Sequence, residues 1–91
     1  MDRIRRNEIE IVRDILQLCI IPSGKTRIVY SCNMNFHTIN RYLRMMLARG
    51  ILIKTKVRGQ NLYGISEDGL STLDSLNAVA PIIEGLKTNG F

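Results

Sequence analysis

Residues 35–65 read NFHTINRYLRMMLARGILIKTKVRGQNLYGI, and their pattern changes from helical to extended at a single glycine. Asn35 is a favourable N-cap, because its side chain can accept a hydrogen bond from the first helical turn. Apolar residues then recur at the spacing of one helix face: Phe36, Ile39, Leu43, Met46 and Leu47. Gly50 can adopt the left-handed conformation that ends a helix. We therefore predict a helix over residues 36–49, with this apolar stripe facing a core.

The residues that follow have the pattern of a β-hairpin. Residues 51–57 form a β-type run, a turn is expected at residues 58–60, and residues 61–65 provide the returning strand. Alternation along the first strand predicts one basic face, made of Lys54, Lys56 and Arg58. The same alternation predicts that the apolar side chains of Ile53 and Val57 face the body of the protein.

Two helices are predicted before this region and one after it. Residues 4–19 have helical periodicity, a break follows at Pro22-Ser23-Gly24, and residues 25–31 form a short second helix. Ser66 is the expected N-cap of the last helix, with anionic residues in its first turn, where the helix dipole favours them. The apolar face of that helix is expected at Leu70, Leu73 and Leu76.

The order of these elements, together with particular residues, resembles a known family. The residues that carry the resemblance are Gly24-Lys25-Thr26-Arg27-Ile28, Asn35-Phe36, Arg41-Tyr42-Leu43, Leu47-Ala48-Arg49-Gly50-Ile51-Leu52, Tyr63 and Ser66-Glu67-Asp68-Gly69. They are similar, over residues 4–76, to archaeal winged helix-turn-helix transcriptional regulators and small basic chromatin proteins. The expected fold class is mainly α (α+β), with a three-helix core, a β-hairpin wing and a C-terminal helix. The resemblance implies DNA binding through the third helix and the wing, in a dimer joined by the C-terminal helix.

The distribution of charge agrees with a nucleic-acid partner. No acidic residue occurs between Asp14 and Glu67. Eight basic residues lie in that interval: Lys25, Arg27, Arg41, Arg44, Arg49, Lys54, Lys56 and Arg58. The interval carries +8 and the rest of the chain −3, which together make the net charge of +5. A solvated surface normally mixes both signs, whereas a phosphate-facing surface needs unopposed cations.

The predicted function is that of a transcriptional regulator that binds double-stranded DNA. The helix over residues 35–49 is expected in the major groove, and the wing over residues 53–62 on the backbone or minor groove. Arg41 is expected to bond guanine, and Thr38 to contact a base. The predicted DNA-binding residues are Lys25, Thr26, Arg27, Asn35, His37, Thr38, Asn40, Arg41, Arg44, Lys54, Lys56, Arg58 and Gln60. Two alternatives stay open: an architectural chromatin protein of low sequence specificity, or a winged-helix protein-interaction module.

Other chemistries have little support. Gly24-Lys25-Thr26 resembles the end of a phosphate-binding loop, but Cys19 stands where that motif needs glycine. We therefore expect Lys25 to start a helix whose free backbone amides hold a DNA phosphate. Cys19 and Cys32 are expected as buried, reduced thiols, with a redox switch as the alternative. One His and two Cys are too few for a structural zinc site. We therefore expect no metal, cofactor, small-molecule substrate, membrane segment or enzymatic activity, and a cytoplasmic, chromosome-associated location.

The C-terminus is predicted to carry the dimer contact. Residues 1–77 are expected to form the DNA-binding domain, and residues 78–91 an extension with a disordered end. The expected homodimer contacts share one side of a continued helix: Leu76, Val79, Ile83 and Leu86. Pro81 should kink or stop this helix, because it cannot donate the backbone bond to Asn77. Folding of the tail back onto the first helix is therefore the alternative.

Overall fold

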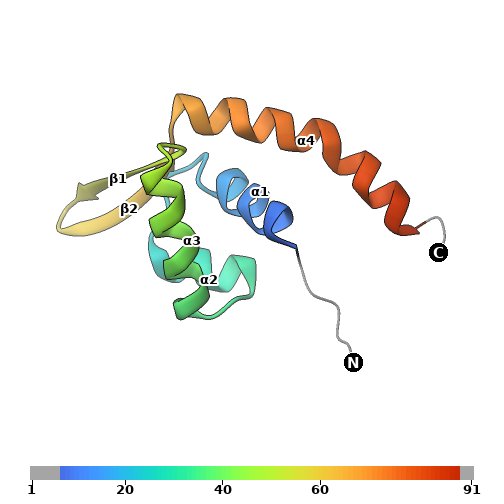
Figure 1. Ribbon diagram of the computed structural model, residues 1–91. Helices are drawn as coiled ribbons and strands as arrows, with labels where there is room; N and C mark the ends of the chain where they lie inside the picture. The colour runs from blue at the N-terminus through green and yellow to red at the C-terminus, as the bar shows by residue number, and fades with distance from the viewer. Residues whose placement is uncertain (1–6, 89–91) are drawn as a thin grey trace.

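In the computed structural model, which describes residues 7–88 and their side chains up to residue 79, four helices surround the base of one antiparallel hairpin. The elements are α1 (Glu8–Leu18), α2 (Lys25–Cys32), α3 (Phe36–Ala48), β1 (Leu52–Val57), β2 (Gln60–Ile65) and α4 (Glu67–Thr88). The hairpin projects to one side, and α4 passes along α1 and continues to the other side (Figure 1). The predicted order of elements is confirmed.

The first helix begins with a reciprocal cap. The side chain of Asn7 accepts a hydrogen bond from the backbone N–H of Glu10 at 2.8 Å, and the carboxylate of Glu10 accepts one from the backbone N–H of Asn7 at 3.3 Å. This arrangement satisfies two amides that the helix itself leaves unpaired. The first described helical residue is therefore Glu8, and the part of the predicted helix before residue 7 lies outside the described residues.

The core is formed mainly by α1, α2 and α3, with β1 and α4 closing it. The largest fully buried side chains are Ile15, Leu16, Ile28, Ile39, Met46, Leu52 and Cys19. Each buried aliphatic side chain contributes about 1.5–3 kcal/mol of hydrophobic free energy. Cys19 and Cys32 are buried as predicted, and neither is in a disulfide. Burial, and secondly the neighbouring Cys32, raises the pKa of Cys19 to about 11, so its thiol stays protonated and a poor nucleophile.

Two apolar residues predicted to face the core are instead exposed. Phe36, the first residue of α3, is 45% exposed, and the buried residues of this helix begin only at Ile39. Tyr42 takes a place in the core that the prediction did not assign to it. On α4, Leu73 is buried and Leu76 packs against the core, but Leu70 is 47% exposed. Leu70 was therefore wrongly included in the buried face of α4.

The predicted helix signals at either end of α3 are confirmed. The side chain of Asn35 accepts a hydrogen bond from the backbone N–H of Thr38 at 2.8 Å. Gly50 follows the helix at a φ of 74°, in the left-handed region. The hydroxyl of Ser66 accepts from the N–H of Gly69 at 2.9 Å and donates to the carbonyl of Gly50 at 2.6 Å. The cap of α4 thus also ties the start of that helix to the end of α3.

The hairpin has a tighter turn than predicted. Val57 pairs with Gln60, so the loop contains only Arg58 and Gly59, whose φ angles are 53° and 79°. Two successive positive φ angles are those of a type I′ turn, which matches the twist of the paired strands. Gln60 therefore belongs to β2 rather than to the turn.

The expected orientation of β1 is wrong for its apolar residues. Leu52, at the base of the strand, is buried, and strand alternation places Lys54 and Lys56 on the same face as Leu52. Ile53 and Val57 therefore lie on the opposite face, where they are 52% and 48% exposed. The body of the protein covers only the base of the hairpin, so alternation alone did not reveal which face it contacts.

The α1–α2 connection adds a bridge to the outer edge of the hairpin. The backbone of Ser23 donates to the carbonyl of Tyr63 at 3.0 Å and accepts from the N–H of Tyr63 at 2.8 Å. The N–H of Ile65 donates to the carbonyl of Cys19 at 3.0 Å. These bonds, which the sequence did not indicate, hold the hairpin in a defined position relative to α1 and α2.

The last helix does not stop at Pro81. It runs as one α-helix from Glu67 to Thr88, across the predicted boundary at residue 77. Proline removes one backbone hydrogen bond, here to the carbonyl of Asn77. Asn77 is exposed, so water can satisfy that carbonyl and the cost of continuing the helix is reduced.

Candidate nucleic-acid interface

The predicted DNA-binding residues come from three elements. Lys25, Thr26 and Arg27 are the first three residues of α2, which has Gly24 as its N-cap and no side-chain cap. The first amides of α2 therefore remain available to an anion, and the helix dipole favours one there. Lys25 is half-buried, whereas Thr26 and Arg27 are exposed.

The outward face of α3 carries the largest group of predicted contacts. His37, Arg41 and Arg44 are exposed and lie one helical turn apart on the face opposite the buried residues. Asn40 and Thr38 are half-buried on the two flanks of this face. The oxygen of the Asn35 side chain is engaged in capping, which leaves its amide nitrogen for other contacts.

One hollow brings the three elements together. It has a volume of about 180 Å3 and is lined by polar and basic residues around an apolar floor: Lys25, Asn40, Leu43, Arg44, Leu47, Lys54 and Tyr63. Three cations, from α2, α3 and β1, thus surround a single recess, and among the described residues no carboxylate lines it. Lys54 can reach this recess because it lies on the same face of β1 as the buried Leu52. The sequence analysis had instead placed Ile53 and Val57 on the face toward the body.

Arg41 lies beside a different hollow. This recess, of about 220 Å3, is lined by Glu8 from α1 and by Arg41, Tyr42 and Met45 from α3. Burial first, and the Glu8 carboxylate second, raise the pKa of Tyr42, while the Arg41 guanidinium opposes the shift. Sequence analysis did not single out Glu8, because its proximity to Arg41 arises only when α1 packs near the middle of α3.

The distal part of the hairpin presents the remaining predicted contacts to solvent. Lys56 is exposed on the face of Lys54, and Arg58 is exposed in the turn. Gln60 pairs with Val57 and therefore lies on the opposite face from Lys56. The predicted basic face of the hairpin thus holds Lys54 and Lys56, with Arg58 at the tip.

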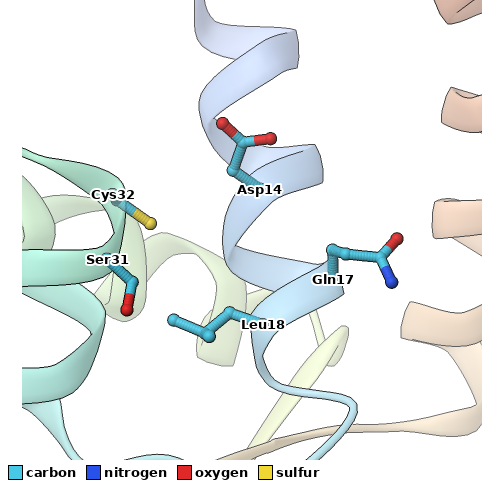
Figure 2. A pocket seen from close by; sticks show the side chains of 5 residues that line it. All are labelled: Asp14, Gln17, Leu18, Ser31 and Cys32. Atoms are coloured by element: carbon cyan, nitrogen blue, oxygen red, sulfur yellow. The ribbon is translucent and has the colours of Figure 1, made fainter.

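A third hollow lies between α1 and the C-terminal end of α2. It has a volume of about 250 Å3 and is lined by Asp14, Gln17, Leu18, Ser31 and Cys32. Figure 2 shows the sulfur of Cys32 pointing from α2 toward α1, while Gln17 points away from α2. The carboxylate of Asp14 lies 3.6 Å from Nε of Arg13. Among the residues that the structure describes, no cation lines this recess, so we do not assign it to the basic surface.

The structure was also searched for a metal site and for membrane-spanning helices. No group of three or more His, Cys, Asp or Glu side chains is arranged to hold a metal ion in the part of the chain that the structure describes. Within that same part, every helix is too short or too polar to span a membrane.

A family model described as winged helix-turn-helix matches residues 5–84. The chain belongs to the winged helix-turn-helix family. In this family α3 occupies the position of the recognition helix, and the β1–β2 hairpin is the wing. The resemblance deduced from the sequence is confirmed, and the match reaches beyond residue 76 into the second half of α4.

Individual proteins resemble this chain in sequence or in structure. An uncharacterised protein of Methanocaldococcus jannaschii is 30% identical over 70 residues, which cover 67% of this chain and 70% of that protein. Sso10a-2, a DNA-binding protein from Sulfolobus solfataricus, is 28% identical, with a TM-score of 0.83 over 91% of this chain and 87% of its own. The transcriptional regulator BldR from Sulfolobus solfataricus is 13% identical, with a TM-score of 0.79 over 89% of this chain and 61% of its own, and shows the fold alone.

Proposed function

We propose that this winged helix protein is a transcriptional regulator that binds double-stranded DNA. The observation that carries the proposal is the hollow in which cations from α2, α3 and β1 meet without an opposing carboxylate among the described residues. The similarity to Sso10a-2, which is a DNA-binding protein, supports it. Such binding requires neither a cofactor nor a catalytic group, and it would bring the protein to the chromosome.

The proposed docking follows from the positions of the basic groups. The outward face of α3 enters the major groove, where His37, Arg41 and Arg44 approach the base edges and the neighbouring backbone. Lys25 at the start of α2 and Lys54 on the wing contact phosphates beside the groove. Lys56 and Arg58 extend these contacts along the wing to the backbone or minor groove.

Salt dependence tests the proposed function directly. If about four to six cations per protomer meet phosphates, the logarithm of affinity should fall against the logarithm of salt concentration with a slope near −4 to −5. The measurement is fluorescence anisotropy of a labelled mixed-sequence duplex at several salt concentrations. A slope near zero, or no binding at low salt, would contradict DNA binding and favour a protein-interaction module.

Selection of binding sites from random duplexes then separates the two DNA-binding alternatives. A regulator should enrich a defined motif, because bidentate contacts to base edges discriminate by about 1–3 kcal/mol each. An architectural protein should enrich none, because contacts to phosphates carry no sequence information.

The recognition helix and the wing should respond differently to substitution. Arg41→Ala is expected to cost about 1–3 kcal/mol on the selected site and to relax the preference at one base position. Arg58→Ala and Lys56→Ala should weaken binding to all duplexes about equally, and each should lower the salt slope by about one unit. Competition assays with single-base variants of the selected site measure both effects. If Arg41→Ala behaves like the wing variants, α3 does not read bases.

We also propose that the protein acts as a homodimer through α4. Leu73 is buried and Leu76 packs on the core, but Val79, one turn after Leu76 and on its side of the helix, is 40% exposed. The apolar row therefore continues beyond the part of α4 that the core covers, and a second copy is the simplest cover for such a row. Ile83 and Leu86, the other predicted contacts, lie on α4 but outside the residues whose side chains are described.

Solution mass tests the dimer. The full chain should have twice the mass of one chain, and truncation after Asn77 should leave a monomer, because it removes most of the row. Val79→Asp should also give a monomer, since an ion at an apolar contact loses its water without gaining a partner. Asn77→Asp, an exposed position of α4 off the apolar row, is the matched control and should leave the mass unchanged. A monomeric full chain at concentrations that saturate DNA would rule the dimer out.

A further inference from the structure

A carboxylate from α1 reaches the side of the recognition helix. Glu8 lines the same hollow as Arg41, with Tyr42 and Met45 completing its walls. Both Glu8 and Arg41 are exposed at the rim of this recess, whereas the Tyr42 side chain is buried. The pKa of Tyr42 responds to both charges in opposite directions, so the carboxylate and the guanidinium lie near the same phenol.

The position of Glu8 is well defined by the start of α1. Asn7 and Glu10, which lie on either side of Glu8 in the chain, form the reciprocal cap. This cap fixes the first turn of α1 and therefore the backbone position of Glu8. An anion in the first turn is favoured by the helix dipole, which explains a carboxylate there. The dipole does not explain why this carboxylate borders Arg41, the residue that we propose to read bases.

We propose that Glu8 sets the sequence specificity of DNA binding by controlling which part of the DNA Arg41 contacts. This inference rests on the proposed function. In water two exposed opposite charges that border one hollow attract each other only weakly, but the attraction gains strength when a duplex excludes water from the interface. A phosphate brought to Arg41 then also meets the Glu8 carboxylate and is repelled, whereas the neutral edge of a guanine is not. Glu8 thus favours base contact over backbone contact, and it acts as a positioning residue.

The test compares two variants that remove one negative charge each. Glu8→Gln keeps the size of the side chain and one of its two accepting oxygens. Asp74→Asn makes the same change at an exposed position of α4, a helix that packs on α1 and β2. For a mixed-sequence duplex, Glu8→Gln should raise affinity about five-fold more than Asp74→Asn does. For a duplex selected by the wild-type protein, Glu8→Gln should give no such gain. The affinity for the selected duplex divided by the affinity for the mixed-sequence duplex should therefore fall about five-fold or more.

Dependence on Arg41 separates positioning from a general change of charge. In the Arg41→Ala background, Glu8→Gln should no longer raise affinity for mixed-sequence DNA beyond the Asp74→Asn control. With Arg41 present, Glu8→Asp, which keeps the negative charge, should retain part of the discrimination that Glu8→Gln loses. Thermal unfolding of each variant checks the fold, and Glu8→Ala replaces Glu8→Gln if that variant unfolds. Equal effects of Glu8→Gln and Asp74→Asn, or an effect that persists without Arg41, would overturn the inference. Failure of the wild-type protein to bind DNA would instead overturn the proposed function.

Discussion

The combined variant Lys25→Gln, Arg44→Gln, Lys54→Gln is expected to bind mixed-sequence DNA about 500-fold more weakly than the wild-type protein near 0.1 M salt. The three cations line one hollow and come from three different elements, so together they can contact neighbouring phosphates. Each phosphate contact contributes about 0.9 to the salt slope, so three lost contacts reduce the slope by about 2.7. Between 1 M and 0.1 M salt, a slope of about 2.7 corresponds to a gain of roughly 500-fold in affinity, which the variant would not have.

Anisotropy titrations at several salt concentrations measure both quantities. The control is Lys87→Gln, near the C-terminal end of α4. That end of the helix lies on the other side of the molecule from the wing (Figure 1), so the substitution should change affinity only slightly. Each of the three single variants should show roughly a third of the triple variant's decrease in the logarithm of affinity, because non-specific phosphate contacts act almost independently. If the triple variant loses no more affinity than the control, this hollow is not a phosphate-binding surface.

Gly69→Ala is expected to destabilise the fold by about 3 kcal/mol, the upper end of the usual cost of overpacking. A Cβ at this position would collide with the backbone carbonyl oxygen of Ile51, and a side-chain carbon of Ile65 is also close. The carbonyl belongs to the chain between α3 and β1, and moving it would strain two hydrogen bonds from Ser66: its hydroxyl donates to the Gly50 carbonyl and its N–H donates to the Ile51 carbonyl. Alanine would gain about 1 kcal/mol of helix propensity over glycine, which is less than the cost of the clash.

Urea unfolding followed by circular dichroism measures this loss, which is a large fraction of the stability of a small domain. Gly64→Ala in β2 is the matched control. A Cβ there would lie 3.7 Å from Pro22, an ordinary contact, so stability should change by less than about 1 kcal/mol. Equal stability of the two variants would contradict the close approach of α4 to Ile51.

Several features of this protein follow from local sequence alone. Asn35, Gly50 and Ser66 end or begin helices as predicted, because a cap depends on hydrogen bonds within one or two turns of chain. The order of helices and hairpin, and therefore the winged helix family, was predictable for the same reason. The basic interval between Asp14 and Glu67 was also visible in the sequence, because the absence of carboxylates needs no knowledge of packing.

Other features depend on which elements meet. From alternation alone, either face of a strand can be the one that contacts the core. Only the packing of Leu52 against the core places Lys54 beside α3 and leaves Ile53 and Val57 exposed. Pro81 was expected to kink or stop the last helix, and the helix does not stop there. Whether a proline stops a helix depends on the solvent around the carbonyl that it leaves unpaired.

The candidate site divides in the same way. Its basic residues were predicted by type and spacing, but their grouping into one hollow required α2, α3 and β1 to converge. Glu8 entered the site only through the packing of α1 near α3, far from Arg41 along the chain. Such contacts between distant segments arise from burial of the shared core, which has no signature within any short stretch of sequence.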